Sequence, residues 1–143
     1  MRAPDPMNAP EALVLTMVLV SAADGGITDR EIGVMAGQVQ TLPIFFDFTT
    51  EQLTEVTDAA VGLLREQNGL DHAARLIREA LTPNLRETAY ALACEVVAGD
   101  RGTKESSLRM LEFVRDELSL DPLIWAAIER GVRARHQRVL PPG

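Results

Sequence analysis

Apolar residues recur at helical spacing along most of the chain. In residues 108–118, leucine and valine return at intervals of three or four residues, which places them on one face of a helix. The strict alternation of apolar and polar residues that marks a half-buried strand is almost absent. The pattern therefore predicts an all-α protein built from amphipathic helices.

Boundary signals divide the chain into seven or eight helices that form a compact bundle. The segments Asn8–Glu11, Thr28–Glu31 and Thr49–Gln52 have the spacing of a capping box, which marks a helix start. Pro83 and Pro122 stand where a first helical residue is expected. The expected helices span residues 8–23, 28–40, 49–68, 70–81, 82–99, 103–118 and 121 onwards.

Between the second and third expected helices lies a short, very apolar segment, Leu42–Phe46. Pro43 prevents the preceding helix from continuing, so we expect a buried connector. No Pro/Ser-rich linker or low-complexity tract interrupts the chain, and a chain of this length can bury about two-thirds of its unfolded surface. We expect one domain over residues 8–138, with flexible termini at 1–7 and 139–143.

The chain contains an internal repeat at a distance of 76 residues. Residues 13–42 and 89–118 each read as an apolar helix, a short acidic turn containing glycine, and a second amphipathic helix. Superposing them without a gap places Asp24 on Asp100. The apolar run Ala12–Val20 therefore has a counterpart in the middle of the chain. We interpret it as a core helix rather than a signal peptide, and it is too short to span a membrane.

Composition narrows the functional classes. The formal net charge is −7, which argues against nucleic acid as a partner. Cys94 is the single cysteine, so an internal disulfide is impossible and zinc cannot be held by several thiolates. Its apolar surroundings in the sequence predict a buried thiol in a protein from a reducing compartment.

Motifs for catalysis are lacking. There is no Gly-x-Ser-x-Gly elbow and no phosphate-binding loop, and Cys94, His72 and His136 lie in no recognised arrangement. We therefore expect no catalytic residue and no enzyme. A hydrolase that uses carboxylates and a metal-bound water is the least favoured hypothesis.

The two acidic turns, residues 23–31 and 99–107, carry the remaining candidate chemistry. Carboxylates on a short turn are the ligands that Ca²⁺ and Mg²⁺ prefer. The spacing is not that of an EF-hand, because the twelfth residue counted from Asp24 is Met35. A structural role explains the same residues: Glu31 completes a capping box, and Asp24 and Asp100 can close turns through backbone N–H groups. Both interpretations remain open.

These residues carry a family resemblance. Ala23–Glu31 reads Ala-Asp-Gly-x-Ile-x-x-x-Glu after an apolar helix, Val97–Ser107 is its second copy, and Leu118–Ile128 begins a closing helix. Over residues 11–135 the chain resembles the TerB-like (tellurite resistance protein TerB) family of bacterial all-helical domains. The resemblance implies a compact helical fold, two neighbouring motif turns, acidic residues that bind a divalent metal, and no enzymatic activity.

Carried onto this sequence, the family's acidic motif residues are Asp24, Glu31 and Asp100. The second copy departs from the pattern, because Arg101 replaces the glycine and Ser107 occupies the position that matches Glu31. Glu105 lies two residues earlier and could compensate, whereas Arg101 could neutralise its neighbour. The candidate metal ligands are therefore Asp24, Glu31, Asp100 and Glu105. The cation, whether Ca²⁺, Mg²⁺, Mn²⁺ or Zn²⁺, is not specified.

The resemblance also implies a role in tellurite and stress resistance. It implies a cytoplasmic protein that acts near the inner membrane with an integral membrane partner, TerC. Tellurite is an anion, so a chain with a net charge of −7 is a poor direct receptor for it.

A basic cluster near the C-terminus is the second candidate site. It is either a solvated helix end that complements the helix dipole or a contact with anionic lipid or an acidic protein. A ligand-free adaptor that docks a partner through this cluster or an apolar groove is the alternative to a cation-binding module. The cluster comprises Arg130, Arg133, Arg135, His136 and Arg138.

Overall fold

Seven α-helices account for most of the described chain, which comprises residues 6–99 and 105–139 of a computed structural model. Within those residues there is no strand, so the predicted all-α class is confirmed. Two short 3₁₀ turns, η1 (Ala22–Asp24) and η2 (Pro43–Phe45), follow the first and second helices. The α-helices are α1 (Ala9–Ser21), α2 (Asp29–Thr41), α3 (Thr50–Leu64), α4 (Gly69–Ala80), α5 (Pro83–Ala98), α6 (Glu105–Glu117) and α7 (Pro122–Arg135).

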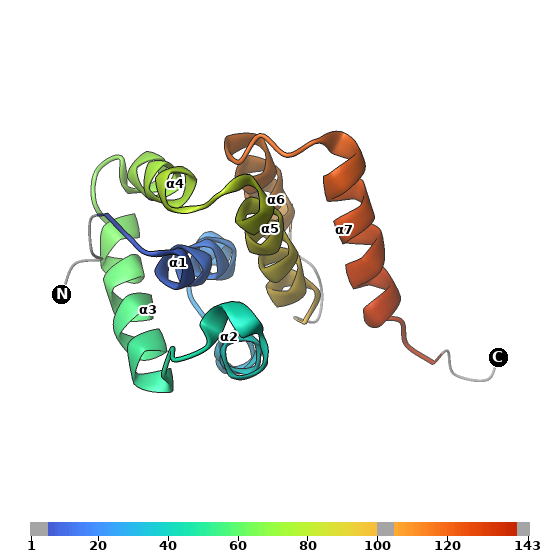
Figure 1. Cartoon of the computed structure of the whole chain (residues 1–143), viewed down its shortest axis with the longest axis horizontal. Coiled ribbons are helices and arrows are strands. Elements are labelled where there is room, and N and C mark those ends of the chain that lie inside the picture. Colours follow the sequence, from blue (N-terminus) through green and yellow to red (C-terminus); the bar gives the residue numbers. More distant parts are fainter. Residues whose placement is uncertain (1–5, 100–104, 140–143) are drawn as a thin grey trace.

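Helix α1 forms the centre of the molecule (Figure 1). Every residue from Ala12 to Ser21 is buried, because α3, α4, α5 and α6 pack around it. A helix that is apolar on all sides is stable only in such surroundings. Two of these buried residues are polar. Thr16 donates its hydroxyl to the carbonyl of Ala12 at 2.8 Å, whereas the hydroxyl of Ser21 has no hydrogen-bond partner among the described residues. The apolar run near the N-terminus is therefore the core helix of this fold.

The three capping boxes form as the sequence predicts. Asn8, Thr28 and Thr49 each accept a hydrogen bond from the backbone N–H three residues later, and the side chain at that later position binds back. The last helix starts in a related way, because Asp121 accepts from the N–H of Leu123. These caps satisfy backbone donors that a helix start otherwise leaves unpaired.

The two copies of the repeat interlock in space. Helices α1 and α5 are counterparts and pack against each other. Each second helix also crosses to the other copy, since α2 contacts α5 and α6 contacts α1. Helices α3 and α4 lie between the copies in the sequence and cover the opposite side of α1 (Figure 1).

Two sequence predictions need correction. The helix predicted over 49–68 ends at Leu64, and the chain turns through Asn68, whose φ is 60°, before α4 begins at Gly69. The connector Leu42–Phe46 is only partly buried. Phe45 packs in the core at 5.6 Å from the ring of Phe48, whereas Phe46 is 83% exposed. A 3₁₀ turn points successive side chains in different directions, so both aromatic rings cannot face inward.

Helix α7 is the least embedded helix of the structure. It packs mainly on α5, and none of its residues is fully buried (Figure 1). Trp125, Ile128 and Val132 are half-buried and face the core. In the described residues, no helix is long and apolar enough to cross a bilayer.

Candidate functional site

The first acidic turn follows directly from the end of α1. Its 3₁₀ turn closes at Gly25, whose φ of 111° lies in a region that residues with a side chain rarely adopt, and whose N–H donates to the carbonyl of Ala22. Glycine therefore has a conformational role here. The backbone of Asp24 lies in this turn, but its side chain is outside the described part of the structure, as is the whole of Asp100.

The described ends of the second acidic turn lie beside the first. The guanidinium of Arg30 donates to the carbonyl of Gly99 at 3.4 Å. The backbone of Gly99 is close to α2, since a Cβ atom there would lie 2.9 Å from the side chain of Val34. On the other side, Ala23 lines a hollow together with Glu105 and Ser106. Both ends of the second turn thus flank the first, as the family resemblance implies.

Glu31, a predicted metal ligand, is buried and has a structural role. Its Oε1 accepts from the backbone N–H of Thr28 at 2.8 Å and from the Thr28 hydroxyl at 3.1 Å. The N–H of Glu31 in turn donates to that hydroxyl oxygen at 3.2 Å. One carboxylate oxygen is therefore committed to the start of α2, and only the other is available to a ligand.

Glu105, the predicted substitute ligand of the second turn, forms an exposed ion pair with Arg109 at 2.8 Å, one helical turn away. Such a surface pair contributes less than about 1 kcal/mol, so it is easily broken. In residues 6–99 and 105–139 no group of three His, Cys, Asp or Glu side chains is arranged to hold a metal. The side chain of Asp24 and the whole of Asp100, the two predicted aspartate ligands, are not among the described groups.

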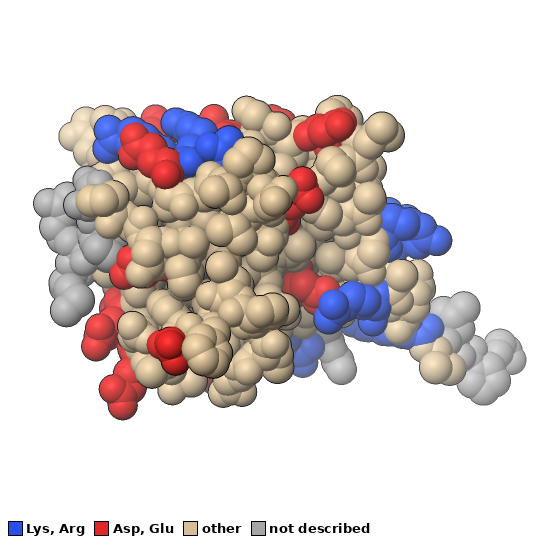
Figure 2. All heavy atoms as spheres, in the orientation of Figure 1, with Lys and Arg blue, Asp and Glu red and all other residues tan. Residues whose placement is uncertain are grey.

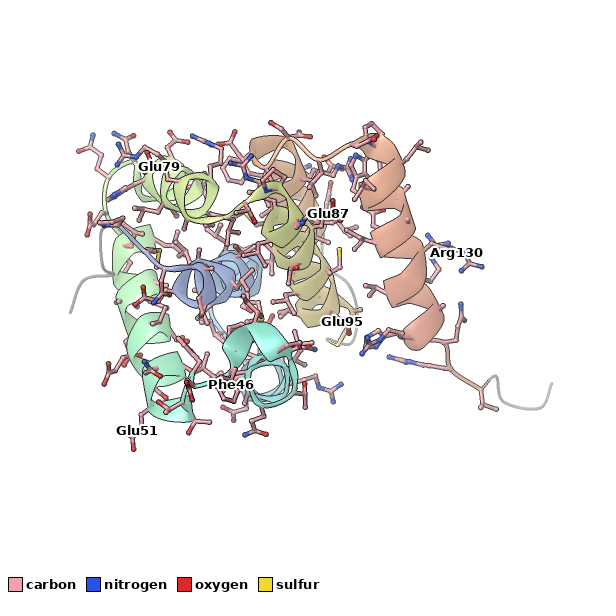
Figure 3. All side chains as sticks on the ribbon, in the orientation of Figure 1. Phe46, Glu51, Glu79, Glu87, Glu95 and Arg130 are labelled. Atoms are coloured by element: carbon pink, nitrogen blue, oxygen red, sulfur yellow. The ribbon has the colours of Figure 1, made fainter. Side chains whose placement is uncertain are left out.

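Part of the basic cluster is tied to α5. Arg135 pairs with Glu95 at 3.1 Å, and Nε2 of His136 lies 2.8 Å from the other carboxylate oxygen. Figure 3 shows Glu95 on the α5 side that faces α7. The sequence offered one signal for this contact, which is a glutamate within the apolar run of α5. His136 therefore attaches the C-terminal end of α7 to α5 through Glu95. This is a contact with one side chain, whereas the sequence led us to expect a general interaction with the helix dipole.

The remaining arginines of the cluster face solvent. Arg130, Arg133 and Arg138 are exposed, and among the described residues none of the three forms an ion pair. Figure 2 shows basic side chains along the outer edge of α7, and in Figure 3 Arg130 points away from α5. These three side chains are free to meet an anionic surface.

A second polar cluster, which the sequence did not predict, holds the middle of α7. The hydroxyl of Tyr90 donates to Glu129, whose carboxylate also accepts from Arg115 at 3.3 Å. The guanidinium of Arg115 stacks over the ring of Trp125, 3.9 Å from its centre. Burial, reinforced by the bond to Glu129, raises the pKa of the Tyr90 phenol far above its ordinary value. These residues are far apart in sequence, so no local motif predicts their contact.

Cys94 is buried beside this cluster, as predicted, and we expect it to resist alkylation. Burial raises the pKa of its thiol to about 12, so the reactive thiolate is rare at pH 8. Iodoacetamide should react at least about 1,000-fold more slowly than with an ordinary exposed thiol. Mass spectrometry of the native and the urea-unfolded protein measures this difference, and equal rates in the two states would contradict a buried thiol.

The same shift has a consequence for stability. The pKa of Cys94 is higher in the folded than in the unfolded chain. The protonated thiol therefore contributes fully to the free energy of unfolding below about pH 9, and this contribution is lost as the pH rises towards 12. Replacement by alanine should remove this part of the alkaline destabilisation.

The fold is an all-helical module in which two acidic turns lie side by side, and comparison with known families agrees with this class. The chain belongs to the family of the tellurite resistance protein TerB, whose model matches residues 10–130. This family is generally non-catalytic. No curated protein and no solved structure matches the chain.

Proposed function

We propose that this TerB module binds a divalent cation at its paired acidic turns and works without catalysis in a tellurite- or stress-resistance complex. The observation that carries the proposal is the meeting of the two turns through Arg30 and Gly99 on one side and Ala23 and Ser106 on the other. Asp24 directly follows Ala23 in the sequence, and Asp100 directly follows Gly99. They are the primary ligands that we propose.

Two further properties support a cation rather than an anion at this place. The net charge of −7 produces an average field that attracts cations and repels tellurite. The second oxygen of Glu31 and the carboxylate of Glu105 can join the aspartates, because the ion pair of Glu105 with Arg109 is weak. Oxygen ligands of this kind suit hard cations such as Ca²⁺, Mg²⁺ and Mn²⁺ better than soft ones.

Thermal unfolding with Ca²⁺, Mg²⁺, Mn²⁺ and Zn²⁺ tests the proposal. An ion present at 100 times its dissociation constant stabilises the folded state by about 2.7 kcal/mol. For a chain of this size the expected rise in Tm is on the order of 10 °C. The double variant Asp24→Asn/Asp100→Asn should lose that rise.

The matched control is Glu51→Gln/Glu55→Gln, which removes two exposed carboxylates from α3 and so changes the net charge equally. It should keep the full rise in Tm. If no ion raises the Tm of the unaltered protein, or if the control loses the rise as well, the acidic turns are structural only. Glu31→Gln then separates the two roles of that residue, because an amide oxygen can still cap α2 but is a poor cation ligand.

The adaptor function is the second candidate, and the exposed arginines of α7 favour it. We propose that Arg130 and Arg138 contact an acidic surface near the inner membrane, either anionic lipid or an integral membrane partner such as TerC. Co-sedimentation with phosphatidylglycerol vesicles and binding to detergent-solubilised TerC compare the two surfaces. Arg130→Glu/Arg138→Glu should abolish the interaction, whereas the control Arg65→Glu/Arg75→Glu should preserve it. Binding that survives the first pair of changes excludes this surface.

A further inference from the structure

Helices α5, α6 and α7 line a hollow of about 460 Å³. It borders the second acidic turn, because Val97 and Ala98 precede that turn in the sequence and Leu108 follows it. This size is within the range of small-molecule sites, which are mostly apolar with a few well-placed polar groups. Its lining combines an apolar part with Tyr90 and six polar or charged side chains. The apolar part comes from all three helices and comprises Cys94, Val97, Ala98, Leu108, Leu111 and Val132.

Polar contacts attach α7 at two places beside the hollow. Tyr90 and Arg115 bind Glu129 in the middle of α7, and Glu95 binds Arg135 and His136 at its C-terminal end. Between these attachments α7 does not fill the space above α5 and α6. Leu108 belongs to the apolar face of α6, yet it is 47% exposed because it lines this space. The fold thus leaves apolar surface accessible where an additional apolar group would be stabilised.

The two arginines that line the hollow differ in their carboxylate partners. Arg115 is neutralised by Glu129, which it contacts at 3.3 Å, and Glu112 lies close enough to act on its charge. Arg133 follows Glu129 by one helical turn, lines the hollow, and forms no ion pair with any described residue. The positive charge without a carboxylate partner is therefore at the end towards the C-terminus of α7.

We propose that this hollow binds a small monocarboxylate with a linear hydrophobic tail. The carboxylate pairs with Arg133, and the tail lies over Val97, Leu111 and Val132 towards Cys94. The C-terminus of α7 carries a partial negative charge that disfavours an anion. Selectivity for a carboxylate therefore depends on the guanidinium of Arg133. This site is independent of the cation site proposed above.

Trp125 is the only tryptophan of the chain. It does not line the hollow itself but stacks on Arg115, which does, so its fluorescence is the probe for binding. We would titrate the full chain with octanoate, 1-octanol and octylamine, which share a tail and differ in the polar group. Octanoate should change the emission saturably, with a dissociation constant about tenfold lower than that of either other compound, as expected for one charge-assisted contact.

Two variants and one control locate the site. Arg133→Gln should weaken octanoate binding about tenfold, to the level of 1-octanol. The control is Arg130→Gln, because Arg130 is also exposed on α7 but does not line the hollow and points away from α5 (Figure 3). It should bind as the unaltered protein does. Ala98→Phe fills the space and should abolish binding of all three compounds, with its folding checked by circular dichroism.

The proposal is overturned if octanoate gives no saturable change, or if 1-octanol or octylamine binds as tightly as octanoate. It is also overturned if Arg130→Gln weakens binding as much as Arg133→Gln does. The last comparison does not require Ala98→Phe to fold. The octanoate titration and the variants Arg133→Gln and Arg130→Gln leave the proposed cation ligands unchanged, and the cation test uses a different readout. Ala98→Phe lies two residues before Asp100, so it does not separate the two sites.

Discussion

Replacing Leu15 by alanine is expected to lower the free energy of unfolding by about 3 kcal/mol. Leu15 is completely buried in α1, which packs against α3, α4, α5 and α6. The variant loses the transfer free energy of the side chain and leaves a cavity that surrounding helices cannot fill by moving independently. Urea unfolding followed by circular dichroism measures the change.

Leu123→Ala is the matched control, because Leu123 is also a helical leucine but is 79% exposed at the start of α7. It should change the free energy of unfolding by less than about 0.5 kcal/mol. A loss below about 1 kcal/mol for Leu15→Ala, or equal losses for both variants, would contradict the central position of α1. Because the repeat packs α1 on α5, the loss should appear in one cooperative transition rather than in a separate unfolding of one copy.

Adding a single methyl group at Gly69 should destabilise the protein by about 2 kcal/mol or more. A Cβ atom there would lie 2.2 Å from the carbonyl oxygen of Leu63 and 3.1 Å from the Cα of Leu64. Both are backbone atoms at the end of α3, so the clash cannot be relieved by a side-chain rotation. Gly69→Ala must therefore separate the end of α3 from the start of α4, which thermal and urea unfolding would detect.

Gly62→Ala provides the opposite expectation on the same helix. Gly62 lies in α3, and apart from the neighbouring backbone of its own helix no atom lies within 4 Å of the place where its Cβ would be. Alanine has the better helix propensity, so this change should stabilise the protein by about 0.5–1 kcal/mol. If Gly69→Ala also stabilises, glycine at the corner is required only as a stop signal and the close approach of the two helices is absent.

These two glycines illustrate what a linear pattern can determine. The sequence predicts a helix over residues 49–68, which places the end of α3 four residues too late. A break does occur near this point, but Gly69 begins α4, and its need for glycine comes from the carbonyl of Leu63 on the preceding helix. Local propensity identifies a break, whereas the contact that requires glycine depends on how two helices meet.

The candidate sites show the same division. Glu31 was predicted both as a cap and as a ligand, and its capping bonds are local, so the sequence could anticipate them. The pairing of Glu95 with Arg135 and His136, and of Tyr90 and Arg115 with Glu129, joins residues of different helices. No periodicity or spacing contains that information, because it depends on where α7 lies on α5.

The sequence by itself therefore determined the helical class, the helix starts, the core helix α1 and the duplicated hairpin. Each of these depends on residues within one or two helical turns, or on direct comparison of two segments. Only the tertiary structure decided that α1 and α5 pack together, that Arg30 reaches Gly99, and that α7 leaves a hollow above α5 and α6. These features arise from the packing of distant apolar faces, and that packing sets the distances at which side chains can meet.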